Sequence, residues 1–519
     1  MDSHVFVLRN LPEVVKGALF SRYSRSPDSL RRILLEEFIN KPEMGFKDIV
    51  CPQEDNQIIA TQKAEKFYDR VLVGYGDDSV AELGGAHIAV EDISIIATKV
   101  IEDSRIGLSP LEKSTRYVLF NEKVDGKYRY YREPQIMQSA EFRDVYVKTC
   151  DMLFDVYTEL IRPLQSYLVK KYPRNSDVSE RAYENTIKAK TCDLLRNLLP
   201  ASTLTNVGLF GNGRAFEYLL MKMSTDKLTE IRHLAEKMQF ELSKVVPSFV
   251  KRVYNEHGDD FRKFVRSTES ELKTIPVKID SDQNKKHYDL ELAYYDEDAI
   301  DKVVAFILYE MTGKPLSDIK ESVEKMPHLQ KSDIIGAYLK KRSNRRHKPG
   351  RAFENVSYTF DILANFGAFR DLQRHRILTQ LKQPLTTDYG YDIPKEITDS
   401  GLADDYVVAM EKAKETFDKI REKYPKEAQY VVPLGYKIRW YFTLNLRELY
   451  HLCELRSGRQ GHIDYRRIAQ DMYVLVKAVH PLLVKHMNFI DLQDYDLERL
   501  DAEKRIDKKI EILKKKWND

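Results

Sequence analysis

Two short clusters of side chains could together bind an anionic ligand that carries a ring. The first is Ser114-Thr115-Arg116-Tyr117. It offers a hydroxyl donor, a bidentate guanidinium and an aromatic face, which suit a nucleotide. The second is Arg374-His375-Arg376, where two fixed positive charges flank a group that titrates near neutral pH and suits phosphates and an electron-rich ring. Taken alone, the first is also compatible with an ordinary exposed strand start and the second with a basic helix end.

The elements that must position these clusters are mostly helical. Apolar residues recur at helical spacing in five stretches: 87–101, 215–239, 299–312, 402–423 and 467–486. Shorter β-rich stretches lie at 114–121, 126–131, 288–295 and 355–362. This pattern predicts an α+β protein with small sheets flanked by long helices.

The two halves of the chain share an ordered set of motifs. Leu199-Pro200 is followed by Asn212-Gly213-Arg214 and Glu230-Ile231-Arg232, and the later copies are Val432-Pro433, Asn445-Leu446-Arg447 and Asp464-Tyr465-Arg466. Twelve residues separate the proline from the asparagine in both halves. Three ordered matches indicate an internal duplication. We therefore predict an N-terminal domain over 1–255, a polar linker over 256–287, and a C-terminal domain over 288–519 that ends in a helix.

Composition places few constraints on function. Lys plus Arg number 84 and Asp plus Glu 81, so the net charge of +3 does not demand a nucleic-acid or membrane partner. No apolar stretch approaches the ~18–20 residues of a membrane helix, and Met1-Asp2-Ser3-His4 lacks the order of a signal peptide. The four cysteines are scattered without a Cys-x-x-Cys pair, so we expect no disulfide framework, no cysteine zinc site and a cytoplasmic location.

The motifs together resemble the signature of the flavin-dependent thymidylate synthases. In that family Arg-His-Arg-x-x-Ser precedes Ser-x-Arg-Tyr, and Leu-Pro, Asn-x-Arg-Glu-Leu and Glu-Ile-Arg follow. Residues 78–82 (Asp-Ser-Val-Ala-Glu) and 347–354 lie where the family has a His-x-Ser-x-x-Glu-His segment. The resemblance covers about 60–250 and 340–485, so the fold it implies is two tandem family domains, each a small, mainly antiparallel sheet with long helices.

The resemblance implies a methyltransferase that uses FAD. NADPH would reduce the flavin, and a methylene group would pass from methylenetetrahydrofolate to C5 of dUMP, giving dTMP. The cofactor performs the redox chemistry, while arginines bind the phosphate and stabilise the anionic uracil ring. The resemblance also implies a homodimer that imitates the family tetramer, with no membrane or nucleic-acid partner.

The family roles pass to matching positions of this chain. FAD would be held by Arg374, His375, Arg376, Asn445, Arg447 and His451. The nucleotide would be bound by Glu112, Ser114, Arg116 and Tyr117. Arg232 or Arg466 would face the uracil and, with Ser114, form the catalytic set. No metal ligands are implied.

Each half departs from the family pattern in a different motif. The second half keeps Arg374-His375-Arg376 but has Thr379 for a serine, and Asp388 stands where the phosphate-binding arginine is expected. The first half keeps Ser-x-Arg-Tyr, but Asp103-Ser104-Arg105 stands where the family has Arg-His-Arg. Our hypothesis is that each half lost what its partner supplies, so that one site is shared. The alternative is a decayed relative that binds flavin, nucleotide or nucleic acid without turnover.

A basic run over 340–351 adds a further candidate. It contains seven Lys or Arg residues and His347, broken by Pro349-Gly350. It could be a solvated loop, a pyrophosphate clamp for FAD or NADPH, or a nucleic-acid patch.

Overall fold

The computed structural model describes residues 6–8, 11–24, 26–40, 78–279 and 289–518. Part of the predicted linker, 280–287, lies outside them. The chain forms two compact units that do not follow the sequence halves: unit 1 combines Met1–Lys113 with Leu204–Ser281, and unit 2 combines Ser114–Thr203 with Asp282–Asp519.

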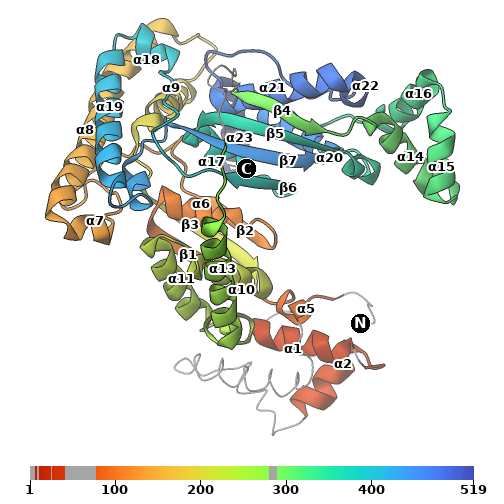
Figure 1. The fold of residues 1–519 in the computed structure, drawn as a ribbon. Coiled ribbons are helices and arrows are strands. Elements are labelled where there is room, and N and C mark those ends of the chain that lie inside the picture. Colours follow the sequence, from red (N-terminus) through yellow and green to blue (C-terminus); the bar gives the residue numbers. More distant parts are fainter. Residues whose placement is uncertain (1–5, 9–10, 25, 41–77, 280–288, 519) are drawn as a thin grey trace. The chain divides into compact units, whose positions relative to one another are not determined.

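Unit 1 is built on a three-stranded antiparallel sheet in the order β1-β3-β2 (Figure 1). The strands are β1 (Gly85–Ser94), β2 (Leu108–Glu112) and β3 (Leu204–Asn212). The helices are α1 (Glu13–Tyr23), α2 (Leu30–Ile33), α5 (Asp78–Ala81), α6 (Ile95–Asp103), α10 (Gly213–Ser224), α11 (Thr229–Leu242), α12 (Pro247–Val250) and α13 (Glu256–Thr274). Helices α6, α10 and α11 contact the sheet and cover its apolar side chains.

Unit 2 contains a four-stranded antiparallel sheet in the order β4-β5-β7-β6. Its strands are β4 (Leu290–Tyr295), β5 (Ser357–Asn365), β6 (Leu378–Lys382) and β7 (Lys437–Asn445). In β7 the buried residues alternate with half-buried ones, Ile438, Trp440, Phe442 and Leu444 all facing the core. That period of two makes this segment a strand with one covered face.

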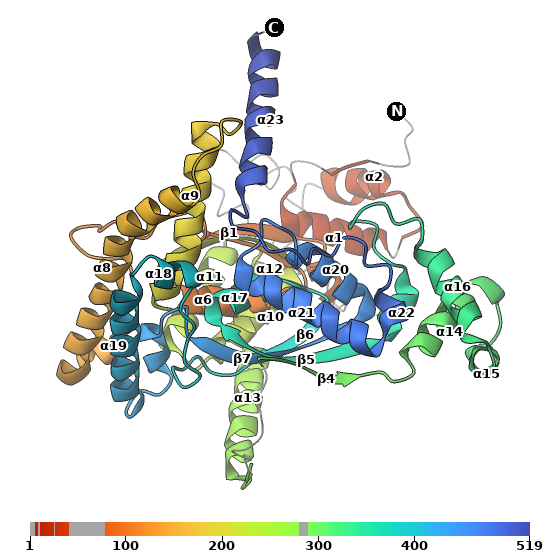
Figure 2. The same ribbon diagram turned by 90° about the horizontal axis from the view of Figure 1, so that it is seen from above.

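Helix α19 (Ala403–Arg421) lies beside α8 (Ala140–Lys171) in unit 2, and three other helices form a separate small cluster (Figure 1). The helices that segment 114–203 contributes to unit 2 are α7 (Pro134–Gln138), α8 and α9 (Glu180–Leu195). The small cluster contains α14 (Ala299–Thr312), α15 (Leu316–Glu324) and α16 (His328–Leu339). The others are α17 (Phe366–Leu372), α18 (Lys395–Asp399), α19 (Ala403–Arg421), α20 (Leu446–Arg456), α21 (Ile463–Val479), α22 (Pro481–Val484) and α23 (Leu500–Asn518). Helix α23 leaves the body of unit 2 beside α9 (Figure 2).

The two sheets repeat one connectivity, which confirms the predicted α+β fold of tandem domains. Strands β1, β2 and β3 with α6, α10 and α11 correspond in order to β5, β6 and β7 with α17, α20 and α21. The first helix of each set is capped by Ser94 or Asn365. Glu230 accepts hydrogen bonds from Ser94, and Asp464 accepts one from Asn365 at 2.6 Å. In both repeats, therefore, the acid of the Glu-Ile-Arg or Asp-Tyr-Arg motif holds the helix-capping residue in place.

The Leu-Pro motifs of the two repeats pair with each other inside unit 2. The Ala201 amide donates to the Val432 carbonyl at 2.8 Å, and the Leu434 amide donates to the Leu199 carbonyl at 2.9 Å. These two bonds interchange when the repeats are interchanged, which is the pattern of an isologous interface between equivalent protomers. Helices α8 and α19 add to it through the Thr149 and Thr416 hydroxyls, 2.7 Å apart.

Three local predictions are wrong. Residues 87–101 were expected to be one helix, but β1 runs to Ser94, which then caps α6. The β-branched residues before Ser94 favour a strand, and no turn residue separates the two elements. Residues 114–121 form a turn, because the Ser114 carbonyl accepts the amides of Tyr117 and Val118, and 126–131 contains isolated bridges instead of a strand.

The predicted linker is largely helical where it is described, since α13 begins at Glu256 and ends at Thr274. Its side chains are almost all exposed. Over the described parts of the chain, no helix combines the length and the apolar character that crossing a membrane requires.

Candidate functional site

The Arg-His-Arg cluster follows the end of α17, with its histidine inside the protein and both arginines exposed. His375 Nδ1 lies 2.7 Å from Glu448 Oε1, and its Nε2 accepts a hydrogen bond of 2.9 Å from Arg456 Nε. An arginine can only donate, so Nε2 carries the lone pair and Nδ1 carries the proton that faces Glu448. His375 is therefore neutral and links Glu448, near the start of α20 (Leu446–Arg456), to Arg456 at its end.

The start of α20 carries the other predicted cofactor residues. Asn445 caps the helix and accepts the Glu448 amide at 2.8 Å. Arg447 donates to the Pro349 carbonyl at 2.7 Å and pairs with Glu354 at 3.1 Å. Burial raises the pKa of Glu448 and lowers that of His451 to about 4.

His375, Glu448 and His451 also lie close enough for a metal, with potential ligand atoms within 4.8 Å of one another. His375 has no lone pair to give, however. Its Nε2 accepts from Arg456 and its Nδ1 bears a proton. The cluster is thus organised as a hydrogen-bond chain.

The Ser-x-Arg-Tyr cluster forms a turn whose arginine points into unit 2. The Ser114 hydroxyl accepts the Arg116 amide at 3.2 Å. Arg116 is buried and makes a bidentate pair with Asp193 of α9, both contacts being 2.7 Å. Burial opposes the Asp193 charge, but the guanidinium of Arg116 outweighs it and lowers the pKa of that carboxyl to about 2.

Tyr465 connects the two clusters. Arg116 Nη1 donates to the Tyr465 hydroxyl at 3.0 Å, and the guanidinium of Arg456 lies 5.6 Å from the centre of the Tyr465 ring. Arg456 in turn holds His375. Burial lowers the pKa of Arg456, and the charge of Arg374 adds to this effect. A continuous polar chain therefore runs from Asp193 to Glu448 inside one compact unit.

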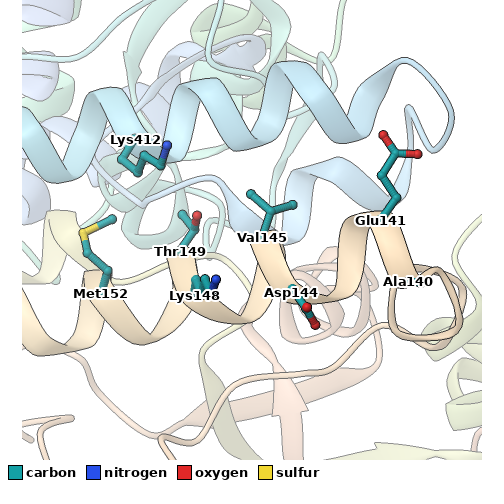
Figure 3. A pocket seen from close by; sticks show the side chains of 8 residues that line it. All are labelled: Ala140, Glu141, Asp144, Val145, Lys148, Thr149, Met152 and Lys412. Carbon is teal, nitrogen blue, oxygen red and sulfur yellow. The ribbon is translucent and has the colours of Figure 1, made fainter.

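A cavity of about 450 Å³ opens on this chain. Its walls include Arg116, Tyr117, Arg345, Arg456, Tyr465 and Arg499. A larger cavity, about 540 Å³, lies between α8 and α19, where Val145 and Thr149 point from one helix toward the other (Figure 3). It is lined by none of the predicted site residues, so the arginine-lined cavity is the candidate site.

The remaining predicted residues are engaged elsewhere. Glu112 ends β2 in unit 1 and pairs with Lys99 at 3.0 Å. Arg232, also in unit 1, donates to the carbonyls of Asp226 and Lys227. Arg466 is fully buried in unit 2 and donates to the carbonyls of Ser457 and Gln493.

Four residues of the candidate site were not predicted from the sequence: Asp193, Arg456, Tyr465 and Arg499. Arg456 and Tyr465 lie inside motifs that were recognised for their neighbours. Asp193 gives no local signal, because it matters only through a partner 77 residues away in the sequence. Arg499 lies in the C-terminal tail, where no motif marks it.

These features define an α+β chain of two fused repeats with an arginine-rich cavity in one unit. Residues 39–248 and 292–482 match the family model described as "Thymidylate synthase complementing protein". The chain belongs to this family, as its motifs predicted.

Related proteins fall into two groups. A UPF0159 protein of Chlamydia pneumoniae is 46% identical over 97% of this chain and 95% of its own length. A flavin-dependent thymidylate synthase of Sulfolobus acidocaldarius is 31% identical over 31% of this chain and 68% of its own. Among solved structures, that of the UMP/dUMP methylase PolB from Streptomyces cacaoi bound with 5-Br dUMP covers 38% of this chain and 93% of its own, at 19% identity and a TM-score of 0.31.

Proposed function

We propose that this chain is a cytoplasmic methyltransferase of the flavin-dependent thymidylate synthase type. It would transfer a methylene group from methylenetetrahydrofolate to C5 of dUMP, giving dTMP, with NADPH as reductant. Family membership and the relative from Sulfolobus acidocaldarius support the reaction class. One observation carries the proposal: the intact Ser-x-Arg-Tyr of the first half and the intact Arg-His-Arg of the second half join one polar chain beside one cavity.

The nucleotide would enter the arginine-lined cavity. Tyr117 is 55% exposed and lines it, so its ring can stack on a base. Arg456 lines the same cavity and can stabilise negative charge that develops on the uracil ring, while the guanidinium of Arg116, paired with Asp193, forms part of the wall. Asp193 and His375 would act as positioning residues, because each holds one of these guanidinium groups in place.

The residues near α20 fit FAD as an anionic ligand. Exposed Arg374 and Arg376 flank His375, and the charges of Lys348 and Arg447 act on the buried carboxylate of Glu448. Guanidinium and ammonium groups of this kind suit a pyrophosphate. His375 and Asn445 use their polar atoms to fix α20, so they would orient the cofactor site. Bound FAD supplies hydride acceptance and one-carbon transfer, chemistry that the side chains lack.

A dimer of this chain would reproduce the assembly expected of four family domains. The isologous pairing of the two Leu-Pro motifs inside unit 2 supports this, because it is the kind of contact that equivalent protomers make.

A decayed binding protein is the second candidate. It is favoured by Arg232 and Arg466, since both arginines expected at the uracil are bound to backbone carbonyls. Such a protein would retain flavin or nucleotide but release no product.

The test uses the full chain, a flavin spectrum and tritium release from 5-labelled dUMP. Tyr465→Phe removes one hydroxyl of the polar chain, and we expect about tenfold less tritium release, the worth of one hydrogen bond. Tyr473→Phe on the same helix makes the same change at a hydroxyl for which no hydrogen bond is found among the described residues, so it should act like the wild type. Binding of flavin or dUMP without tritium release supports the decayed alternative, and binding of neither refutes both.

A further inference from the structure

The cavity is completed by a segment outside the family match. The match ends at residue 482, and the chain continues through α22 and a loop into α23. Phe489, Asp491 and Arg499 from this C-terminal segment line the arginine-lined cavity. A wall of the candidate site therefore comes from residues beyond the family match.

Arg499 is a buried cation without a carboxylate partner among the described residues. It is 8% exposed, its guanidinium carbon lies 3.8 Å from the centre of the Tyr117 ring, and its Nε is buried without a hydrogen bond in the described part of the chain. The buried side chains of Arg116 and Arg342 each have an acid, Asp193 and Glu454. Fully buried Arg466 has no acid but donates to two backbone carbonyls, a compensation that the Nε of Arg499 lacks within the described residues. Burying a charge without a counter-charge is unfavourable, so the position of Arg499 indicates an anionic ligand.

The structure around Arg499 holds it in place. On one side Glu498 pairs with Lys190 at 2.8 Å, and on the other Asp501 pairs with Arg459. Further along α23, Glu503 and Asp507 both bind Arg181 of α9. A cation fixed by its neighbours loses little freedom on binding a ligand, which favours affinity.

The charges that line the cavity leave a positive excess. Arg116 is neutralised by Asp193, and the acid Glu454 is neutralised by Arg342. Arg345, Arg456 and Arg499 then face one acid, Asp491, whose oxygens already accept bonds from the Gln493 amide and the Tyr495 hydroxyl. An excess of about two charges matches a phosphate monoester, which carries about −1.5 to −2 at neutral pH.

We propose that the C-terminal segment supplies Arg499 as the phosphate-binding residue of this site, so that the cavity selects a nucleoside monophosphate over the nucleoside. The base would lie near Tyr117, whose ring already packs against the Arg499 guanidinium. The identity of the base rests on the proposed function, whereas the phosphate contact does not.

The experiment compares wild type, Arg499→Gln and Arg499→Lys by calorimetric titration of the full chain with dUMP and with 2′-deoxyuridine. We expect Arg499→Gln to weaken dUMP binding roughly 10- to 100-fold, the range of a charge-assisted hydrogen bond, while deoxyuridine binding is unchanged. Arg499→Lys should fall between. Arg505→Gln is the matched control, because Arg505 lies on α23, the helix that begins directly after Arg499, is exposed and has no ion pair within the described residues.

A second measurement separates this inference from the proposed function. Inorganic phosphate should raise the thermal unfolding midpoint of the wild type but not of Arg499→Gln, and without phosphate the variant should be no less stable than the wild type. If phosphate stabilises the wild type only through Arg499 while dUMP does not bind, the inference stands and the proposed nucleotide is wrong. Equal losses for dUMP and deoxyuridine, or phosphate stabilisation that survives Arg499→Gln, would overturn it.

Discussion

The buried pair between Arg116 and Asp193 gives the sharpest quantitative test, and Asp193→Asn is the perturbation. The variant keeps the shape of the side chain but leaves the Arg116 guanidinium buried without its counter-charge. The fall in the Asp193 pKa from 3.8 to about 2 corresponds to about 2 kcal/mol of folding free energy at neutral pH. Removing one partner of a buried pair typically costs about 3–5 kcal/mol. We therefore expect unit 2 to lose about 2–5 kcal/mol.

Urea unfolding followed by Trp440 fluorescence measures this loss within unit 2. Trp440 is buried in β7, and a Trp517→Phe background removes the second of the two tryptophans. Asp399→Asn is the matched control, because Asp399 forms a half-exposed pair with Lys171 at 3.1 Å that should be worth at most about 1 kcal/mol. Equal effects of the two substitutions would refute the assignment of Arg116 and Asp193 as a buried structural pair.

The same pair predicts the sign of a pH effect. The Asp193 pKa is lower in the folded than in the unfolded chain, so the stabilisation is fully present above about pH 4 and is lost as the pH falls toward 2. The difference between wild type and Asp193→Asn should therefore narrow between pH 5 and pH 3. A difference that widens over this range contradicts the argument.

Four further outcomes follow from the same structure. Burial lowers the His451 pKa to about 4, so the unfolded chain binds this proton first, and stability should fall less between pH 6.5 and 4 in His451→Gln than in the wild type, as read from urea midpoints. Glu454→Gln should cost about 3–5 kcal/mol by breaking a buried pair, whereas Glu82→Gln, at an exposed pair, should cost at most about 1 kcal/mol when unfolding is followed by circular dichroism. Burial raises the thiol pKa of Cys150 and Cys192 to about 12, so iodoacetamide at pH 8 should modify neither in the folded protein and both in urea, as peptide mass spectrometry would show. Titration with dUMP should give one site per chain, and two equal sites would contradict a single shared cavity.

The repeat architecture was predictable because both repeats keep the residues that fold them. Asn212 and Asn445 each cap the helix after a strand by accepting an amide three residues on. The arginines of the same motifs pair with upstream acids, Arg214 with Glu82 and Arg447 with Glu354. The two caps are local bonds that motif spacing records, so the order of strands and helices could be inferred from it.

The composition of the two units was not predictable in the same way. Segment 114–203 follows unit 1 in the chain but packs in unit 2, and this depends on contacts between residues hundreds of positions apart. No periodicity encodes which repeat an amphipathic arm will pack against. The same limit explains why the hydrogen bonds of Arg466 could not be predicted from its motif. The two carbonyls that accept them come from loops that only the folded chain brings together.

Under the proposed shared site, the place of segment 114–203 in unit 2 gives a reason why the two motif copies diverged in opposite directions. Where identical protomers share each site between two subunits, as the resemblance implies for the family, every copy must keep both motifs. Fusion makes the sites inequivalent, so a residue needed at one site can be replaced at its counterpart. The counterpart of Arg374 is Asp103, which now pairs with Lys222 in unit 1. Asp388, at the place of an arginine, now pairs with Arg421 at 2.6 Å. At both places the residue that stands for a family cation is an acid paired with a lysine or arginine of its own unit, whereas Arg116, Arg374 and Arg376 all belong to unit 2.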